Sequence, residues 1–183
     1  MRFHRPVMLV MAAFSRHDSA LNWARETSCK HWGELLCESD RFVFDQTSFY
    51  EREMGSDLRK TFFAYANLVD PLDLPAVKLQ AIAWEKEFAA FDFHEEARPL
   101  NLDPGYLTEA KFVLATTKDR DHRLVLADGI FGEVTLYFHR GTWTTREWTY
   151  PDYCSEEYHD FFTKCRDELR DLYSRDETLG LHA

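Results

Sequence analysis

The sequence has few of the residues that interrupt regular structure, with only 7 glycines and 6 prolines among 183 residues. Disordered linkers and collagen-like chains are rich in both, so this composition excludes those classes. A long hydrophobic run is also missing. The run from Pro6 to Phe14 is far shorter than the ~18 apolar residues of a membrane helix, and it is short for a signal peptide. We therefore interpret it as a buried strand and expect a cytoplasmic protein without a membrane segment.

Paired cysteines are missing as well. The four cysteines form no C-x-x-C pair, and none has the spacing to a histidine that zinc fingers use; they are Cys29, Cys37, Cys154 and Cys165. We expect free thiols, which agrees with a reducing cytoplasm.

Positive charge is scarce, because 22 Lys and Arg residues stand against 32 Asp and Glu residues, for a formal net charge of −10. A protein that binds nucleic acid needs a positive face to neutralise phosphates, so we expect no nucleic-acid partner. A local basic pocket remains compatible with this balance.

Apolar residues are plentiful, at 45% of the chain, and 15 of them are phenylalanines. We expect a core built on aromatic side chains. The length fits one domain over residues 1–183, with a core from about residue 5 to residue 176 and a frayed tail after it.

Apolar periodicity predicts the order of helices and strands. We expect strands over Val7–Phe14, Leu35–Glu38, Arg41–Asp45, Lys60–Leu68, Arg98–Leu102, His122–Ala127, Ile130–His139 and Thr142–Thr149. We expect helices from Asp18 to Gly33, from Asp73 to Phe91, from Pro104 to about Thr116 and from Ser155 to about Asp176. The segment from Gln46 to Gly55 is expected to be irregular.

Two kinds of local signal support this order. Asp103-Pro104 matches a helix start, with Asp at the N-cap and Pro in the first turn. Asp128-Gly129 and Arg140-Gly141 lie between alternating segments and indicate hairpin turns. Together these signals predict an α+β fold, with a mainly antiparallel sheet of about five to seven strands and helices packed on it. The first strand, helix and second strand would add one parallel pair.

Five segments match a known family, namely FDQTSFYEREMG from Phe44, NLDPGY from Asn101, TKDRDHR from Thr117, DGIFGEVTL from Asp128 and EWTYPDY from Glu147. With the C-terminal helix they make the chain resemble the bacterial family called domain of unknown function 4416, from about Arg5 to Tyr173. The resemblance implies a single-domain bacterial protein without an established activity. Some members carry a GTP-binding label, but this chain has no G-x-x-x-x-G-K-[ST] phosphate loop.

The basic run from Lys118 to Arg123 carries the leading functional hypothesis. In an extended segment Lys118, Arg120 and His122 would share one face, and such a set of donors suits a phosphate or a carboxylate. We expect an anionic small molecule, for example a phosphate-bearing one, to bind through Lys118, Arg120, His122 and Arg123, with Tyr106 and Tyr137 lining the pocket. The alternative is that these charges are solvated or paired with Asp119 and Asp121.

A second hypothesis is a metal-assisted hydrolase. Asp45, Glu53 and Glu133 would hold Mg²⁺ if the fold brought them within ~4–6 Å of one another. His122 would then serve as the base, and Glu53 and Glu133 are further catalytic candidates.

A third hypothesis is a non-enzymatic interaction module with an exposed aromatic patch. We expect Trp148, Tyr150 and Tyr153 to be core or packing residues, and the alternative is that they form an aromatic wall for a planar ligand. The sequence does not specify a cofactor, a ligand or an oligomeric state.

Overall fold

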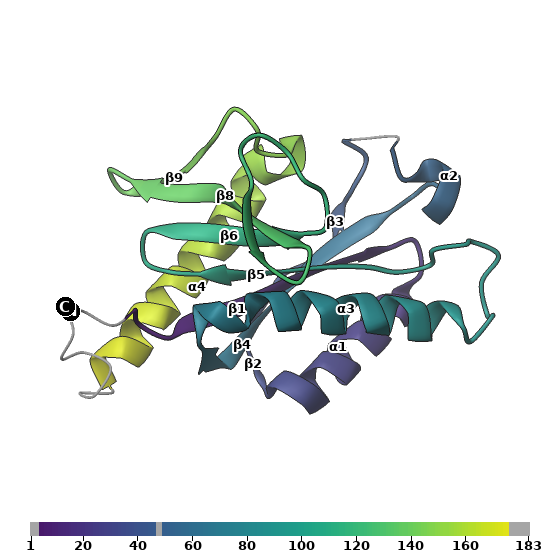
Figure 1. Cartoon of the computed structure of the whole chain (residues 1–183), viewed down its shortest axis with the longest axis horizontal. Helices are drawn as coiled ribbons and strands as arrows, with labels where there is room; N and C mark the ends of the chain where they lie inside the picture. The colour runs from purple at the N-terminus through teal and green to yellow at the C-terminus, as the bar shows by residue number, and fades with distance from the viewer. Residues whose placement is uncertain (1–3, 47–48, 176–183) are drawn as a thin grey trace.

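The structure is a computed structural model that describes residues 4–46 and 49–175, and its strands form one twisted sheet (Figure 1). The strands are β1 (Val7–Ser15), β2 (Leu35–Glu38), β3 (Phe42–Val43), β4 (Arg59–Val69), β5 (Asn101–Leu107), β6 (Lys111–Thr116), β7 (Leu124–Ala127), β8 (Ile130–His139) and β9 (Thr142–Thr145). The helices are α1 (Asp18–Trp32), α2 (Glu51–Met54), α3 (Leu74–Ala89) and α4 (Glu156–Arg175), and two short 3₁₀ turns cover Pro71–Asp73 and Pro151–Cys154.

The sheet order is β2-β4-β1-β5-β6-β8-β7, with β3 added on β4 and β9 added on β8. This confirms the α+β class and the antiparallel sheet, although nine strands exceed the expected five to seven. Across the described residues, no helix combines the length and the apolar character needed to cross a membrane. The predicted fraying after Asp176 concerns residues outside the described part.

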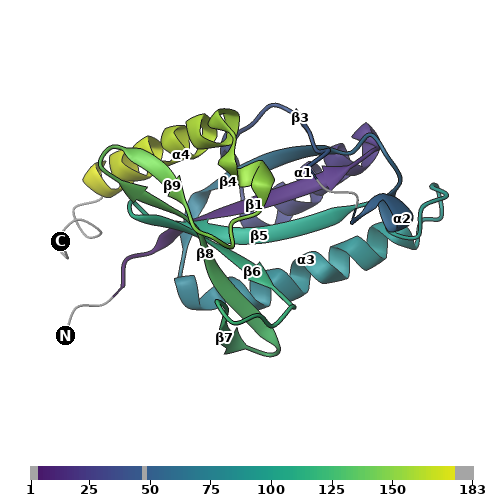
Figure 2. The ribbon, with the colours of Figure 1, turned by 90° about the horizontal axis from the view of Figure 1, so that it is seen from above.

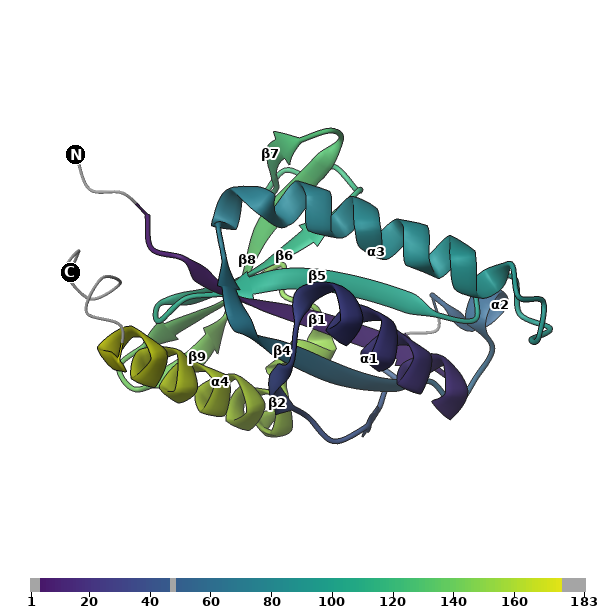
Figure 3. The ribbon, with the colours of Figure 1, turned by 90° about the horizontal axis from the view of Figure 1, so that it is seen from below.

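Alternation along β1 divides the core into two layers. Met8, Val10 and Ala12 point to the face that α4 covers, together with the apolar residues of that helix. Leu9, Met11 and Ala13 point to the opposite face, which α1 and α3 cover. Figures 2 and 3 show these two faces of the sheet. Because both faces are buried, β1 has the continuous apolar sequence that predicted a central strand.

The predicted parallel pair is wrong. β4 lies between β1 and β2 and pairs with both in the antiparallel sense. The two predicted hairpin turns are present, however. Asp128, Gly129, Arg140 and Gly141 all have positive φ, as two-residue type I′ turns require.

The predicted helix from Pro104 to Thr116 is also wrong, because this segment forms the hairpin of β5 and β6. Pro104 pairs with Met11 of β1 and precedes Gly105, where pairing with β6 begins. A proline is tolerated where one side of a strand carries no ladder. The apolar spacing that suggested a helix arises because both faces of this hairpin are buried.

Smaller differences concern the ends of elements. The expected irregular segment from Gln46 to Gly55 contains the short helix α2. The strand expected from His122 begins at Leu124, and the strand expected to reach Thr149 ends at Thr145. The residues that were expected in these two strands but lie outside them belong to loops that border a cavity.

Candidate functional site

A cavity of about 630 Å³ lies at one end of the sheet, where β5 and β6 separate. These strands pair only over Gly105–Leu107 of β5 and Phe112–Leu114 of β6. Beyond that point β6 follows β8, and Figure 2 shows both turning away from β5. Residues of both separating strands line the cavity, which has the size of ordinary small-molecule sites.

The separation leaves a backbone edge of β5 without a partner strand, and α3 supplies the missing bonds. Glu85 accepts a hydrogen bond from the Leu102 N–H at 2.6 Å. Lys78 donates to the Leu102 carbonyl at 2.8 Å. Helix α3 runs along β5 (Figure 3), so both side chains reach the same residue. The N–H and the carbonyl of Leu102 are therefore both hydrogen-bonded although no strand pairs with this edge.

The cavity is rich in positive charge although the whole chain is acidic. Six Lys and Arg side chains line it, against three carboxylates. The cations are Lys60, Lys78, Arg98, Lys118, Arg120 and Arg123, and the carboxylates are Asp103, Glu133 and Asp152.

The three carboxylates of the cavity each form an ion pair with one of its cations, and the first of these pairs joins Lys60 to Asp152. Lys60 Nζ donates to Asp152 Oδ2 at 2.6 Å, and both side chains are buried. The ammonium also lies over aromatic rings, at 4.3 Å from the centroid of Tyr153 and 5.1 Å from that of Phe44. Cation–π attraction and the ion pair together compensate for burying this charge.

The second group joins α3 to β5. Lys78 Nζ lies 2.9 Å from Asp103 Oδ1, and Asn101 donates to Asp103 Oδ2 at 2.7 Å. Arg98 donates to Asn101. Burial alone would raise the pKa of the Asp103 carboxyl, but the charges of Lys78 and Lys60, with the hydrogen bonds, hold that pKa below its usual range.

The third group centres on Glu133 of β8. Arg123 Nε donates to Glu133 Oε2 at 2.6 Å, and His122 Nε2 lies 3.2 Å from the same oxygen. The imidazole of His122 stacks on Trp148 at 5.0 Å, and Arg123 also donates to the Tyr150 hydroxyl at 3.0 Å. Burial would lower the pKa of Arg123, but its hydrogen bond and ion pair with Glu133 raise it.

Lys118 and Arg120 differ from the other cations of the cavity. Both are exposed, and neither forms an ion pair with any residue that the structure describes. Lys118 Nζ lies 4.5 Å from the ring centroid of Phe49. Two cations are thus left available at the open side of the cavity.

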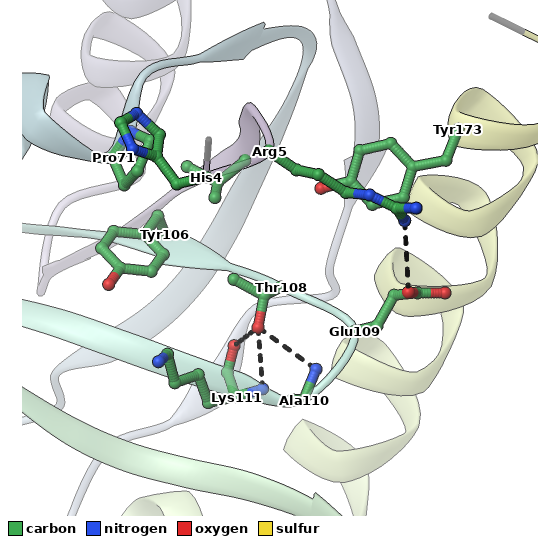
Figure 4. Close-up of a pocket in the computed structure, with 10 residues that line it drawn as sticks. His4, Arg5, Pro71, Tyr106, Thr108, Glu109, Ala110, Lys111 and Tyr173 are labelled. Atoms are coloured by element: carbon green, nitrogen blue, oxygen red, sulfur yellow. Dashed lines mark hydrogen bonds and ion pairs between the residues drawn. The ribbon is translucent and has the colours of Figure 1, made fainter. Parts of the chain in front are cut away.

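The structure brings together four of the six predicted ligand-binding residues, because Lys118, Arg120, His122 and Arg123 all line the cavity. They lie in a loop before β7 rather than in an extended strand. The other two lie elsewhere. Tyr106 borders a smaller hollow with Arg5 and Lys111 (Figure 4), and Tyr137 packs under Arg146, whose guanidinium is 3.7 Å from the ring centroid.

The acids of the hydrolase hypothesis do not converge. Glu133 lines the cavity, whereas Asp45 and Glu53 do not. In the described residues, one group of three side chains is close enough to share a metal ion, and it consists of His17, His94 and Glu96. None of these three lines the cavity.

The three aromatic residues of the EWTYPDY segment differ in exposure. Tyr153 is buried in the core, whereas Trp148 and Tyr150 are exposed residues of the cavity wall. The longest exposed apolar run lies on β7, the last strand in the sheet order, where Leu124, Val125 and Leu126 are exposed.

Sequence reasoning missed Lys60, Lys78, Asp103 and Asp152 as site residues. A signal existed for the two lysines. Lys60 is the second residue of β4, on the face that continues with Phe62 and Ala64, and Lys78 lies on the buried face of α3. A lysine within an apolar pattern indicates a buried partner.

The fold and site define a class, an α+β protein with a cation-rich cavity at a split in its sheet. A family model described as domain of unknown function (DUF4416) matches residues 5–169, so the chain belongs to that family. A search of curated proteins and a search of solved structures found no match. Each of the five segments that carried the resemblance contributes residues to the cavity, among them Tyr50, Asn101, Arg120, Glu133 and Asp152.

Proposed function

We propose that this protein binds an anionic small molecule, a phosphate ester, in the cavity between β5 and β6. The observation that carries the proposal is the excess of cations over carboxylates in the cavity of a chain with a net charge of −10. A concave wall of one sign concentrates ligands of the opposite sign.

The cations of the cavity differ in their ion pairing, and this difference supports the proposal. Lys60, Lys78 and Arg123 already hold carboxylates of the cavity, while Lys118 and Arg120 hold none among the described residues. Arginine binds phosphate with two parallel hydrogen bonds, and lysine adds a mobile point charge. Lys118 and Arg120 would therefore take the anionic end of the ligand.

The test is a calorimetric titration with a panel of phosphate esters, comparing the native chain with Lys118→Gln/Arg120→Gln. We expect binding that weakens by about tenfold or more in this variant, since each lost charge-assisted hydrogen bond contributes ~1.5–3 kcal/mol. Lys30→Gln, at an exposed position of α1, is the matched control and should bind as the native chain does. No binding of any phosphate ester at millimolar concentration would refute the proposal.

We also propose a cytoplasmic bacterial protein without a nucleic-acid partner. All four cysteines are free, as expected in a reducing compartment. The net charge of −10 opposes binding to a phosphate backbone. Fractionation of the source cells would test the location.

A further inference from the structure

Glu133 of β8 uses one of its two carboxylate oxygens in the contacts that the structure describes. The side chain is 1% exposed, and both of its side-chain partners, Arg123 and His122, contact Oε2. Oε1 is buried and has no hydrogen-bond partner among the described residues. The Tyr153 hydroxyl is likewise buried and has no hydrogen-bond partner among the described residues. Glu133 and Tyr153 both line the cavity.

An unpaired carboxylate oxygen in a buried site costs free energy, so its presence in a binding cavity points to a ligand that supplies the missing donor. We infer that the ligand carries hydroxyl groups, at least one of which donates a hydrogen bond to Glu133 Oε1. The ligand is then a hydroxyl-bearing phosphate ester. This inference rests on the proposed function, because the phosphate is assigned to Lys118 and Arg120 there.

The charges around Glu133 decide between the two common kinds of donor. Arg123 and His122 already face this carboxylate, and cations outnumber carboxylates in the cavity. An ammonium group on the ligand would enter a region with surplus positive charge and be repelled. A hydroxyl group is neutral and satisfies the same oxygen without that repulsion.

The aromatic part of the cavity wall suits the carbon skeleton of such a ligand. Tyr50, Trp148 and Tyr150 contribute apolar surface next to the polar groups. Both a free sugar phosphate and a nucleotide combine a phosphate, hydroxyl groups and an apolar face, so the cavity chemistry covers both sources.

The first test needs no mutation. Propyl phosphate and glycerol phosphate share a three-carbon skeleton and a phosphate and differ in their hydroxyl groups. We expect glycerol phosphate to bind the native chain at least about tenfold more tightly, the gain expected of a hydrogen bond to a charged acceptor. Equal binding of the two compounds would overturn this inference and leave anion binding intact. Failure of both compounds and of the wider phosphate panel would overturn both proposals.

The second test assigns the preference to Glu133. Glu133→Gln should reduce the ratio of the two affinities while propyl phosphate still binds, because a neutral amide forms a weaker hydrogen bond with a hydroxyl group than a carboxylate does. Glu26→Gln, at an exposed position of α1, changes the net charge equally and should keep the native ratio. If Glu133→Gln keeps the ratio as well, the assignment to Glu133 is wrong. Ribose phosphate and adenosine monophosphate then distinguish the two sources. Tighter binding of ribose phosphate identifies a free sugar phosphate as the ligand, and tighter binding of adenosine monophosphate identifies a nucleotide.

Discussion

Lys60 and Asp152 are separated by 92 positions in the chain and meet in a nearly water-free part of the cavity wall. The lysine is held from one side by the carboxylate and from others by aromatic rings. Removing one member of such a pair leaves the other charge buried without a partner. The free-energy cost of that unpaired charge exceeds the stability that the intact pair contributes. The same reasoning applies to Lys78 with Asp103 and to Arg123 with Glu133.

At the residue scale we predict that Lys60→Met lowers the free energy of unfolding by about 3–5 kcal/mol, because Asp152 loses its only described partner while staying buried. Urea denaturation measures the change. Lys30→Met is the control on the exposed surface of α1 and should change stability by less than ~0.5 kcal/mol. Lys60→Met with nearly native stability would show that the pair is not buried as described.

The residues of the site differ in how far sequence could foresee them. Lys118, Arg120, His122 and Arg123 lie within six positions of the sequence, and all four line the cavity although the strand expected from His122 begins only at Leu124. The ion pairs that complete the site join residues far apart in the chain, and one sequence contains no information about such pairing. Tyr106 illustrates the same limit, because its strand was taken for a helix.

At the element scale, β5 depends on close approach to its neighbour. A Cβ on Gly105 would overlap the carbonyl oxygen of Val113 and lie 2.9 Å from the ring of Phe112. Both contacts come from β6, which has to lie against β5 here before the two strands separate.

We predict that Gly105→Ala lowers the free energy of unfolding by about 1–3 kcal/mol, because the backbone of β6 must shift. Gly132→Ala is the matched control in the same sheet. The atoms nearest to its new methyl group belong to the side chain of Leu126, which is exposed, rather than to the backbone. Chemical denaturation of both variants measures the difference, and equal effects would contradict this packing.

The misassigned hairpin shows how valid local signals can predict the wrong type of element. Asp103-Pro104 is a valid helix start in local terms, yet Asp103 bonds to Lys78 of α3 and Pro104 pairs with β1. Tertiary pairing outweighed the local preference. The strands β1, β4 and β8 were predicted well because their apolar patterns are long and their ends are marked by turns.

At the scale of the whole molecule, stability depends on pH through groups with shifted pKa values. The pKa of Asp103 is below its ordinary value of 3.8, so folding favours the charged form. This contribution is complete above the ordinary value and is lost as pH falls through the lower folded value. Burial raises the pKa of Glu85, which acts in the opposite direction.

We predict that Asp103→Asn lowers the free energy of unfolding by about 1–3 kcal/mol near neutral pH, because Lys78 loses a charged partner. The difference from the native chain should shrink as pH falls below the ordinary value of 3.8, and it should vanish below the lowered pKa of the folded state, where the native carboxyl is neutral too. Urea denaturation over a pH series checks this. Asp40→Asn, at an exposed position, is the control and should follow the native curve. A constant difference at all pH values would contradict the assignment.

The three residue pairs that join β5 to β6 form a narrow seam between two parts of the sheet. One part contains β2, β4, β1 and β5, and the other contains β6, β8, β7 and β9. Cations of the cavity come from both sides, with Lys60 on the first and Arg123 beside the second. A change in the angle between the two parts would therefore alter the width of the cavity and the spacing of its charges together.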